Sequence, residues 1–320
     1  MINFEYARAS SVADAVRQIA ADPKAKFIAG GTNLIDLLKE DVERPGRLID
    51  ITRLPLKTIE ERADGSLRIG ALVPNSDLAY YPLIEQRYPL LSSAILAGAS
   101  QQLRNMATTG GNLLQRTRCY YFYDVATPCN KREPGSGCSA INGVNRMHAI
   151  LGSSEACIAT HPSDMCVALA ALEAKVHVMG PSGERAIAFA DFHRLPGDTP
   201  QRDSNLHDDE IITGVELPSH GFARNYTYLK IRDRLAYAFA LVSVAVGLDL
   251  SGGTVQEARL SLGGVSTSRG ATPRPKQRCA GRRRMLRISS VPLRSCCVMP
   301  RVIHTTLSRS IWRAARSCAR

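Results

Sequence analysis

The chain has 320 residues and a formal net charge of +12. Because 44% of its residues are hydrophobic, it can bury the cores of two or three modest domains. We expect no membrane insertion, since no apolar run approaches the roughly 20 residues that a spanning helix needs. An export signal is not expected either, because Glu5 and Asp14 fall where a signal peptide needs a basic start and an apolar core. The nine cysteines lack short paired spacings, which favours thiols, a metal site or a cluster over disulfides.

Helix and strand patterns alternate in the first part of the chain. Ser11 is a suitable N-cap for a helix through Val16 and Ile19, with Asp14 facing the positive end of the helix dipole. Further on, two strands flank a short helix, which predicts a small βαβ-like unit. These elements are a strand at residues 27–29, a helix at 34–39 and a strand at 47–51, followed by a strand at 67–72 and a helix at 90–99.

From residue 175 the pattern changes to alternating apolar and polar residues, which is typical of half-buried strands. Turns rich in Gly, Pro and Asp separate them. A mainly antiparallel C-terminal part is therefore predicted. Its strands are expected at residues 175–179, 211–217, 225–231, 239–248 and 255–262.

The net positive charge lies entirely at the end of the chain. Of the 41 Lys and Arg residues, 14 fall in residues 269–320, which contain no Asp or Glu, and this leaves 27 basic against 29 acidic residues before them. The charge therefore does not predict a nucleic-acid-binding fold. Trp312 is the only Phe, Tyr or Trp in this tail, so nucleic-acid binding through it stays an alternative that would show as salt-dependent affinity for DNA.

Two glycine-rich loops give the first indication of function. In residues 28–38 (IAGGTNLIDLL), consecutive glycines after a strand let the backbone approach a pyrophosphate while N–H groups point at its oxygens. Neither GxGxxG nor GxxxxGK[ST] is present, and an isolated glycine pair more often makes only a tight turn. Residues 108–112 (TTGGN) form a second such loop, and two loops suit a ligand with two distant polar ends.

Four cysteines follow the second loop: Cys119, Cys129, Cys138 and Cys157. Their spacing, C-x9-C-x8-C-x18-C, lacks the C-x2-C knuckle of recognisable zinc and ferredoxin sites, so spacing alone leaves a shared metal and separate thiols equally open. The segment between them is rich in Gly, Pro, Asn and Ser and would wrap irregularly around a centre. Cys166 is expected to be a small buried hydrophobic residue. His148 and His161 are candidate metal ligands, although loop histidines more often bind nothing.

Four segments together resemble one known family: AGGTNLIDL (residues 29–37), RNMATTGGN (104–112), HPSDM (161–165) and YLKIRDR (228–234). The family comprises the FAD-binding subunits of molybdenum hydroxylases, the xanthine dehydrogenases and aldehyde oxidoreductases. The similarity covers about residues 1–265. It is greatest to the flavin and iron–sulfur subunit of heterotrimeric periplasmic aldehyde oxidoreductases.

The resemblance implies where FAD is held. The first loop would hold the pyrophosphate, the second would contact the flavin side, and a carboxylate and an amine would complete the pocket. Taken alone, that carboxylate would more often be a helix N-cap and that amine a solvated strand residue. No catalytic residue is expected on this chain. The implied residues are Phe27, Ile28, Ala29, Gly30, Gly31, Thr32, Asn33 and Leu34 at the pyrophosphate, Thr108, Gly111, Asn112 and Gln115 at the flavin, and Asp164 and Lys230 in the pocket.

The resemblance also implies a 4Fe-4S cluster, since some flavin subunits of this family bind one through four cysteines in an extra loop at this place. All four positions are occupied here, which favours iron and sulfur over zinc. The implied ligands are Cys119, Cys129, Cys138 and Cys157.

The implied partners complete an electron-transfer complex. A molybdenum-cofactor subunit would oxidise an aldehyde or a heterocycle, a 2Fe-2S subunit would relay the electrons, and FAD in this chain would pass them to an external acceptor. The heterotrimer would be periplasmic by co-export with a partner that carries a signal, and otherwise cytoplasmic. The alternative is a stand-alone FAD-dependent oxidoreductase with a structural metal site, which would need a substrate domain and a catalytic base of its own.

The expected fold is α+β. A two-part FAD-binding domain would comprise a βαβ-like subdomain at residues 1–55 and a mixed subdomain at 56–180, with the cysteine-rich loop at 116–158. An antiparallel C-terminal α+β domain would span 181–267. After LGGV, the family usually continues with a Lys-Pro-Trp-Arg-like segment, whereas this chain has STSRGATPRPKQRC. We therefore interpret residues 268–320 as a basic tail that is disordered or frameshift-derived, which would leave the last domain incomplete.

Overall fold

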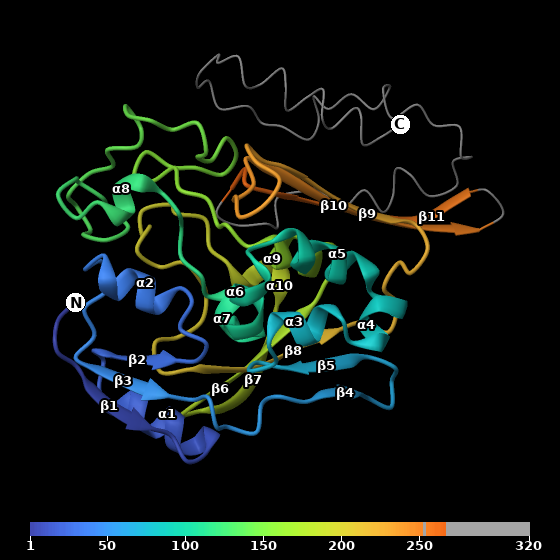
Figure 1. The fold of residues 1–320 in the computed structure, drawn as a ribbon, viewed down its shortest axis with the longest axis horizontal. Coiled ribbons are helices and arrows are strands. Elements are labelled where there is room, and N and C mark those ends of the chain that lie inside the picture. Colours follow the sequence, from blue (N-terminus) through green and yellow to red (C-terminus); the bar gives the residue numbers. More distant parts are fainter. Residues whose placement is uncertain (252–253, 267–320) are drawn as a thin grey trace.

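A computed structural model describes residues 1–251 and 254–266, so the interpretation of residues 268–320 lies outside the described residues. Within these ranges the chain forms three β-sheets, and a layer of short helices lies between the second and the third (Figure 1). This is the α+β fold that the sequence predicts.

The N-terminal sheet is parallel, with strand order β1-β3-β2. Ser11 caps the first helix as predicted, because its side chain accepts a hydrogen bond from the backbone N–H of Asp14 at 3.0 Å. This helix buries Ala15, Val16 and Ile19 in the core that it shares with the sheet. The elements are β1 (Glu5–Arg8), α1 (Val12–Ala21), β2 (Ala25–Ile28), α2 (Leu34–Lys39) and β3 (Arg47–Asp50), so β2, α2 and β3 form the predicted βαβ unit.

The second sheet is antiparallel and five-stranded, with order β4-β5-β8-β6-β7. The domain boundary expected at residue 180 falls between two of its strands, so the sheet continues past that boundary. Alternation marks a strand in the sequence, but it does not show which partners the strand pairs with. The strands are β4 (Ile59–Glu61), β5 (Leu67–Gly70), β6 (Lys175–Gly180), β7 (Gly183–Ala188) and β8 (Ile211–Leu217).

Short helices cover one face of this sheet. Two of them, α5 and α9, are buried on nearly all sides because they also contact the third sheet. Within the described ranges, none of the helices is long and apolar enough to span a bilayer. The helices are α3 (Asn75–Ala79), α4 (Pro82–Arg87), α5 (Pro89–Ala97), α6 (Gln101–Met106), α7 (Thr109–Leu113), α9 (Asp164–Ala171) and α10 (Phe189–Phe192), while α8 (Tyr120–Tyr123) lies in the cysteine-rich loop.

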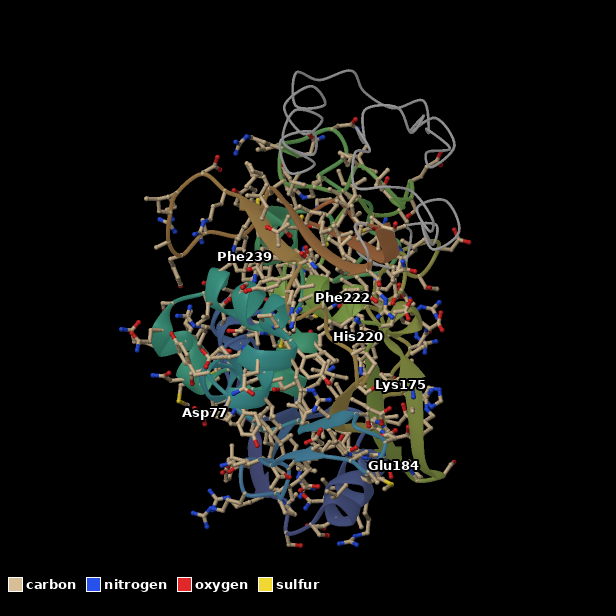
Figure 2. All side chains as sticks on the ribbon, turned by 90° about the vertical axis from the view of Figure 1, so that its right-hand side faces the viewer. Asp77, Lys175, Glu184, His220, Phe222 and Phe239 are labelled. Atoms are coloured by element: carbon tan, nitrogen blue, oxygen red, sulfur yellow. The ribbon has the colours of Figure 1, made fainter. Side chains whose placement is uncertain are left out.

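The third sheet is antiparallel, as predicted, with order β11-β10-β9. Phe222 and His220 lie in the connection that leads from the second sheet to the third (Figure 2). The Phe222 side chain is buried and occupies the space over Gly247, where a Cβ would lie 2.6 Å from its ring. Glycine at this position therefore lets the connection pack closely on the sheet. The strands are β9 (Tyr226–Ile231), β10 (Val242–Ser251) and β11 (Thr254–Gly263).

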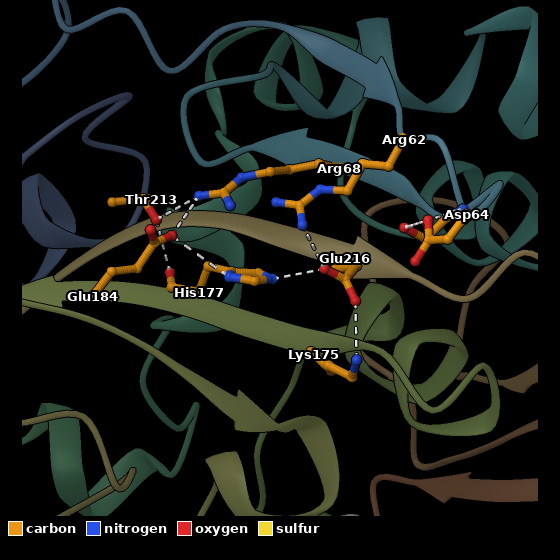
Figure 3. A network of polar contacts seen from close by, with 9 residues as sticks. Arg62, Asp64, Arg68, Lys175, His177, Glu184, Thr213 and Glu216 are labelled. Atoms are coloured by element: carbon orange, nitrogen blue, oxygen red, sulfur yellow. Dashed lines mark hydrogen bonds and ion pairs between the residues drawn. The ribbon is translucent and has the colours of Figure 1, made fainter.

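A network of charged side chains lies on the five-stranded sheet (Figure 3). The Glu216 carboxylate accepts a hydrogen bond from Lys175 Nζ at 3.0 Å, lies 3.0 Å from His177 Nε2 and forms an ion pair with Arg62 at 3.5 Å. Burial by itself would raise the pKa of this carboxyl. The hydrogen bonds with Lys175 and His177 outweigh burial and hold the pKa below its usual value.

We expect Glu216→Gln to destabilise the fold by about 1–2 kcal/mol at neutral pH, as loss of a partly exposed charged hydrogen bond does. Because the folded chain lowers this pKa, the carboxylate contributes stability above the unfolded value of about 4.3 and loses it as the pH falls through the folded value. Chemical unfolding of both proteins at about pH 7 and about pH 3 measures the difference. A difference that stays the same at both pH values would contradict the role of the charge.

Candidate functional site

The first glycine loop connects β2 to α2 and meets the second loop backbone to backbone. A Cβ on Gly30 would lie 1.8 Å from the carbonyl oxygen of Met106. No side chain fits there, so glycine at this position allows the two loops to adjoin. Gly31 has a φ of 72°, in the left-handed region that favours glycine, and turns the chain into α2. Every residue from 27 to 34 is half-buried, as a segment that lines a binding site would be.

Asn33 connects the first loop to the segment that follows the second loop. Its Oδ1 accepts a hydrogen bond from the backbone N–H of Arg116 at 2.9 Å. Its Nδ2 is buried and has no hydrogen-bond partner within the described part of the chain. A buried donor without a partner costs free energy, and a ligand oxygen beside this loop would remove that cost.

The second loop is attached to the segment that follows β5. Thr109 donates hydrogen bonds from its backbone N–H and its hydroxyl to the carbonyl of Val73, at 2.9 and 3.0 Å. Thr108 caps α7, since its Oγ1 accepts a hydrogen bond from the N–H of Gly111 at 3.2 Å. These contacts hold the loop in one conformation without help from a ligand, which reduces the ordering cost of binding.

Asn112 and Gln115 connect the second loop to α9. Gln115 Nε2 donates to Asn112 Oδ1 at 2.7 Å, and the same oxygen accepts from the Ser163 hydroxyl at 2.7 Å. Ser163 is the N-cap of α9, since its Oγ accepts from the N–H of Cys166. The N-cap role considered for Asp164 from sequence alone therefore belongs to Ser163.

Asp164 and Lys230 form a buried ion pair between α9 and β9. The Asp164 Oδ2 lies 2.8 Å from the Lys230 Nζ, and the two side chains are 7% and 4% exposed. Tyr228 donates its hydroxyl to the other oxygen of Asp164 at 2.5 Å, and Lys230 also donates to the carbonyl of Ala97 at 3.0 Å. Tyr228 and Lys230 are two positions apart on one strand, so both face the helix. Lys230 is thus not the solvated residue that its sequence position alone suggests.

These contacts run in series across the molecule. The first loop reaches the residues just before and just after the second loop through Gly30 and Asn33, the second loop reaches α9 through Asn112, and α9 reaches β9 through Asp164. Pairwise contacts therefore link all the segments in which FAD-binding residues are expected. The Tyr228 hydroxyl also belongs to this arrangement; Tyr228 lies in the YLKIRDR motif but is not among the residues that the resemblance implies for FAD.

The four cysteines of the cysteine-rich loop line one cavity. Cys119 precedes α8, the backbones at Cys129 and Cys138 pair antiparallel, and Cys157 follows a turn. The irregular loop thus surrounds a shared centre, as its composition suggests. The rest of the lining is mixed: Phe122, Pro128, Ala140, Ala156 and Ala159 are apolar, and Thr117, Tyr121, Asn130, Lys131 and Ser139 are polar.

Burial raises the pKa of the Cys119 thiol to about 11, and the neighbouring Cys129 and Cys157 act in the same direction. The pKa of Cys157 is raised too, mainly by burial and partly by Cys138, while the positive charge of Lys131 opposes the shift. Such thiols stay protonated at neutral pH by themselves. A cationic metal centre reverses this, since it binds cysteines as thiolates.

An ion-pair network connects the cysteine cavity with the glycine loops. Asp203 pairs with Lys131 of the cysteine-rich loop at 2.5 Å and with Arg116 at 2.8 Å. Arg116 also pairs with Glu43 at 2.6 Å, and its guanidinium lies 4.7 Å from the ring centre of Phe122. These four charges are too far apart in the sequence for their pairing to be predicted from it.

Among the described residues, one group of three metal-ligating side chains has donor atoms within 4.8 Å of one another: His161, Cys166 and His193. Both imidazoles place Nε2 at the carbonyl oxygen of Leu113, at 3.2 and 2.9 Å, and their rings lie 4.2 Å apart. They fix the end of α7, so we assign them a structural role. Cys166 is fully buried, as expected. His148, the other candidate ligand, lies with Nε2 3.1 Å from Cys119 Sγ.

A family model for the FAD-binding domain in molybdopterin dehydrogenase matches residues 2–220, and the chain belongs to this family. The matched range contains both glycine loops, the cysteine cavity and Asp164.

Similarity to individual proteins agrees with this assignment. The chain is 53% identical over 264 residues to the aldehyde oxidoreductase FAD-binding subunit PaoB of Escherichia coli (strain K12), which covers 82% of this chain and 81% of that protein. It is 28% identical over 263 residues to the glyceraldehyde dehydrogenase medium chain of Sulfolobus acidocaldarius, covering 82% and 75%. Among solved structures, carbon monoxide dehydrogenase from Hydrogenophaga pseudoflava is similar with a TM-score of 0.66 and 26% identity, covering 88% of this chain and 83% of that chain.

Proposed function

We propose that this chain is the electron-transfer subunit of a molybdenum-dependent aldehyde oxidoreductase, with FAD and a 4Fe-4S cluster bound to it. The observation that carries the proposal is the four-cysteine cavity in a chain whose two glycine loops adjoin. The 53% identity to an aldehyde oxidoreductase FAD-binding subunit supports aldehydes as the substrate class of the complex.

The residues of the glycine loops fit FAD. The backbone of residues 27–34 and the Asn33 amide would hold the pyrophosphate, and the second loop, with Asn112 and Gln115, would contact the flavin side. Asp164 and Lys230 would complete the pocket. Bound FAD supplies the electron chemistry, whereas this chain supplies donors that its own contacts already hold in position.

The cavity suits a cluster better than a single zinc ion. Zinc–sulfur bonds of about 2.3 Å in a tetrahedron place the sulfur atoms about 3.8 Å apart. Within the described ranges, no three of the four cysteines have sulfur atoms within 4.8 Å of one another. Four cysteines around one cavity supply the number and type of ligands that a 4Fe-4S cluster uses.

The chemistry on the substrate would take place in a partner. A molybdenum-cofactor subunit would oxidise the aldehyde, and a 2Fe-2S subunit would deliver the electrons to this chain, which would pass them to an external acceptor. No side chain here would act as catalytic acid, base or nucleophile. The heterotrimer would reach the periplasm by co-export of this chain with a partner.

Cofactor analysis of the complex purified without air tests the proposal. We expect about one FAD and about four iron atoms per chain. Cys138→Ser should lose most of the iron and keep FAD, while the matched change Ser139→Ala, beside it on the cavity wall, should keep both. Zinc or no metal in the wild-type complex would overturn the proposed cluster but not the proposed FAD site. Absence of FAD would contradict the role of the glycine loops.

A further inference from the structure

His148 is a buried histidine whose contact points to a function in the cluster site. It lies between Cys138 and Cys157 in sequence and is 5% exposed. Its Nε2 lies 3.1 Å from Cys119 Sγ. The backbone holds it there, because the N–H of Ala149 donates to the carbonyl of Ile158 at 2.7 Å. A thiolate that binds a metal can only accept a hydrogen bond, so Nε2 carries the proton when Cys119 is a ligand.

Cys119 lies between the cysteine cavity and a second cavity that contains Asp164. Together with Thr117, it lines the cavity that contains all four cysteines. The same two residues line a second cavity, which His148 shares with Asp164. Of the four cysteines, Cys119 alone lines both cavities, so within the described chain it is the cysteine that adjoins the cavity of Asp164.

We propose that His148 sets the reduction potential of the cluster by donating a hydrogen bond to its ligand Cys119. The proposal rests on the 4Fe-4S cluster of the proposed function. Reduction of the cluster by one electron, from a partner or from a chemical reductant, would add negative charge that the thiolate ligands share. The N–H of His148 stabilises that charge, so the reduced form gains more than the oxidised form and the potential rises. No bond is made or broken, and the proton stays on Nε2.

The charge of Lys131 cannot replace this contact. Its ammonium group forms an ion pair with Asp203 at 2.5 Å and donates to the carbonyl of Pro200, so a carboxylate compensates its charge. The hydrogen bond from the backbone N–H of Ala159 to Cys157 Sγ, at 3.4 Å, is independent of any side chain. Cys119 also accepts hydrogen bonds from the backbone N–H groups of Phe122 and Tyr121, which a side-chain substitution leaves in place. Within the described ranges, His148 is therefore the side-chain donor to a ligand sulfur that substitution can remove.

Redox titration of the purified complex, followed by the EPR signal of the reduced cluster, tests the proposal. We expect His148→Phe to keep its iron and FAD, to shift the potential to a more negative value and to change the EPR spectrum. His148→Gln keeps a side-chain N–H and should restore the potential in part. Ser139→Ala, which changes the cavity wall without removing a donor to sulfur, should leave it unchanged. A cluster with an unaltered potential in His148→Phe would overturn the proposal.

A second measurement uses the wild-type complex, so it tests the hydrogen bond even if His148→Phe does not fold. In wild-type complex labelled with ¹⁵N-histidine, pulsed EPR of the reduced cluster should show a weak ¹⁵N coupling, as expected for a hydrogen bond to a ligand sulfur. A strong coupling would mean that His148 binds iron directly, and no coupling would mean no contact; either result overturns the proposal. Wild-type complex without iron would instead contradict the proposed function itself, so the two failures can be distinguished.

Discussion

Gly30→Ala is expected to weaken FAD binding by about 100-fold or more, the scale of effect that a displacement of about 1 Å at a functional contact produces. The new Cβ would lie 1.8 Å from the carbonyl oxygen of Met106 and 2.7 Å from its carbonyl carbon, and neither is the flexible end of a side chain. The first loop must therefore move away from the second, and its backbone N–H groups would leave the proposed pyrophosphate position.

A matched substitution separates this effect from a general effect of adding a methyl group. At Gly46, also in the N-terminal unit, a Cβ would meet nothing nearer than Lys24 at 4.0 Å, so Gly46→Ala should bind FAD as the wild type does. Flavin absorbance after purification and titration of the flavin-free proteins with FAD measure both variants. Wild-type affinity in Gly30→Ala would show that the contact between the loops is not needed to hold the ligand.

Local patterns in the sequence predict the elements on which the site is built. Ser11 and its helix, the βαβ unit and the alternating strands after residue 175 follow from interactions between near neighbours, and the structure contains all of them. The glycine loops are also recognisable, because glycine pairs mark positions where the backbone turns tightly or approaches another group.

The arrangement of the site depends on contacts between distant residues, which a single sequence does not indicate. β5 pairs with β8 across a separation of more than 140 residues, so the expected boundary at residue 180 falls inside one sheet. Similarly, the irregular cysteine spacing gives no reason for the four thiols to share a cavity. They meet because the backbones at Cys129 and Cys138 pair and because Cys157 returns to the same place through a turn.

Lys230→Met is expected to destabilise the chain by about 3–5 kcal/mol, the usual cost of removing one partner of a buried ion pair. Asp164, 7% exposed, would keep the hydrogen bond from Tyr228 but lose its counter-charge. The carbonyl of Ala97 would keep a donor, since Arg232 also donates to it at 3.0 Å, so the loss would come from the uncompensated carboxylate. Chemical unfolding at neutral pH measures the change.

Two further variants decide what the pair is for. Arg146→Met breaks an ion pair with Asp233 whose side chains are 52% and 62% exposed, and should cost no more than about 1 kcal/mol. If Lys230→Met costs as little, the buried pair does not stabilise the fold as its burial implies.

A double variant separates the role of the pair in folding from its role in binding. Asp164→Asn combined with Lys230→Met removes both charges and keeps an acceptor for Tyr228, so it should recover much of the stability. Because the pair would also line the FAD pocket, we expect this double variant to bind FAD weakly even though it is stable; wild-type affinity would limit the pair to holding the fold.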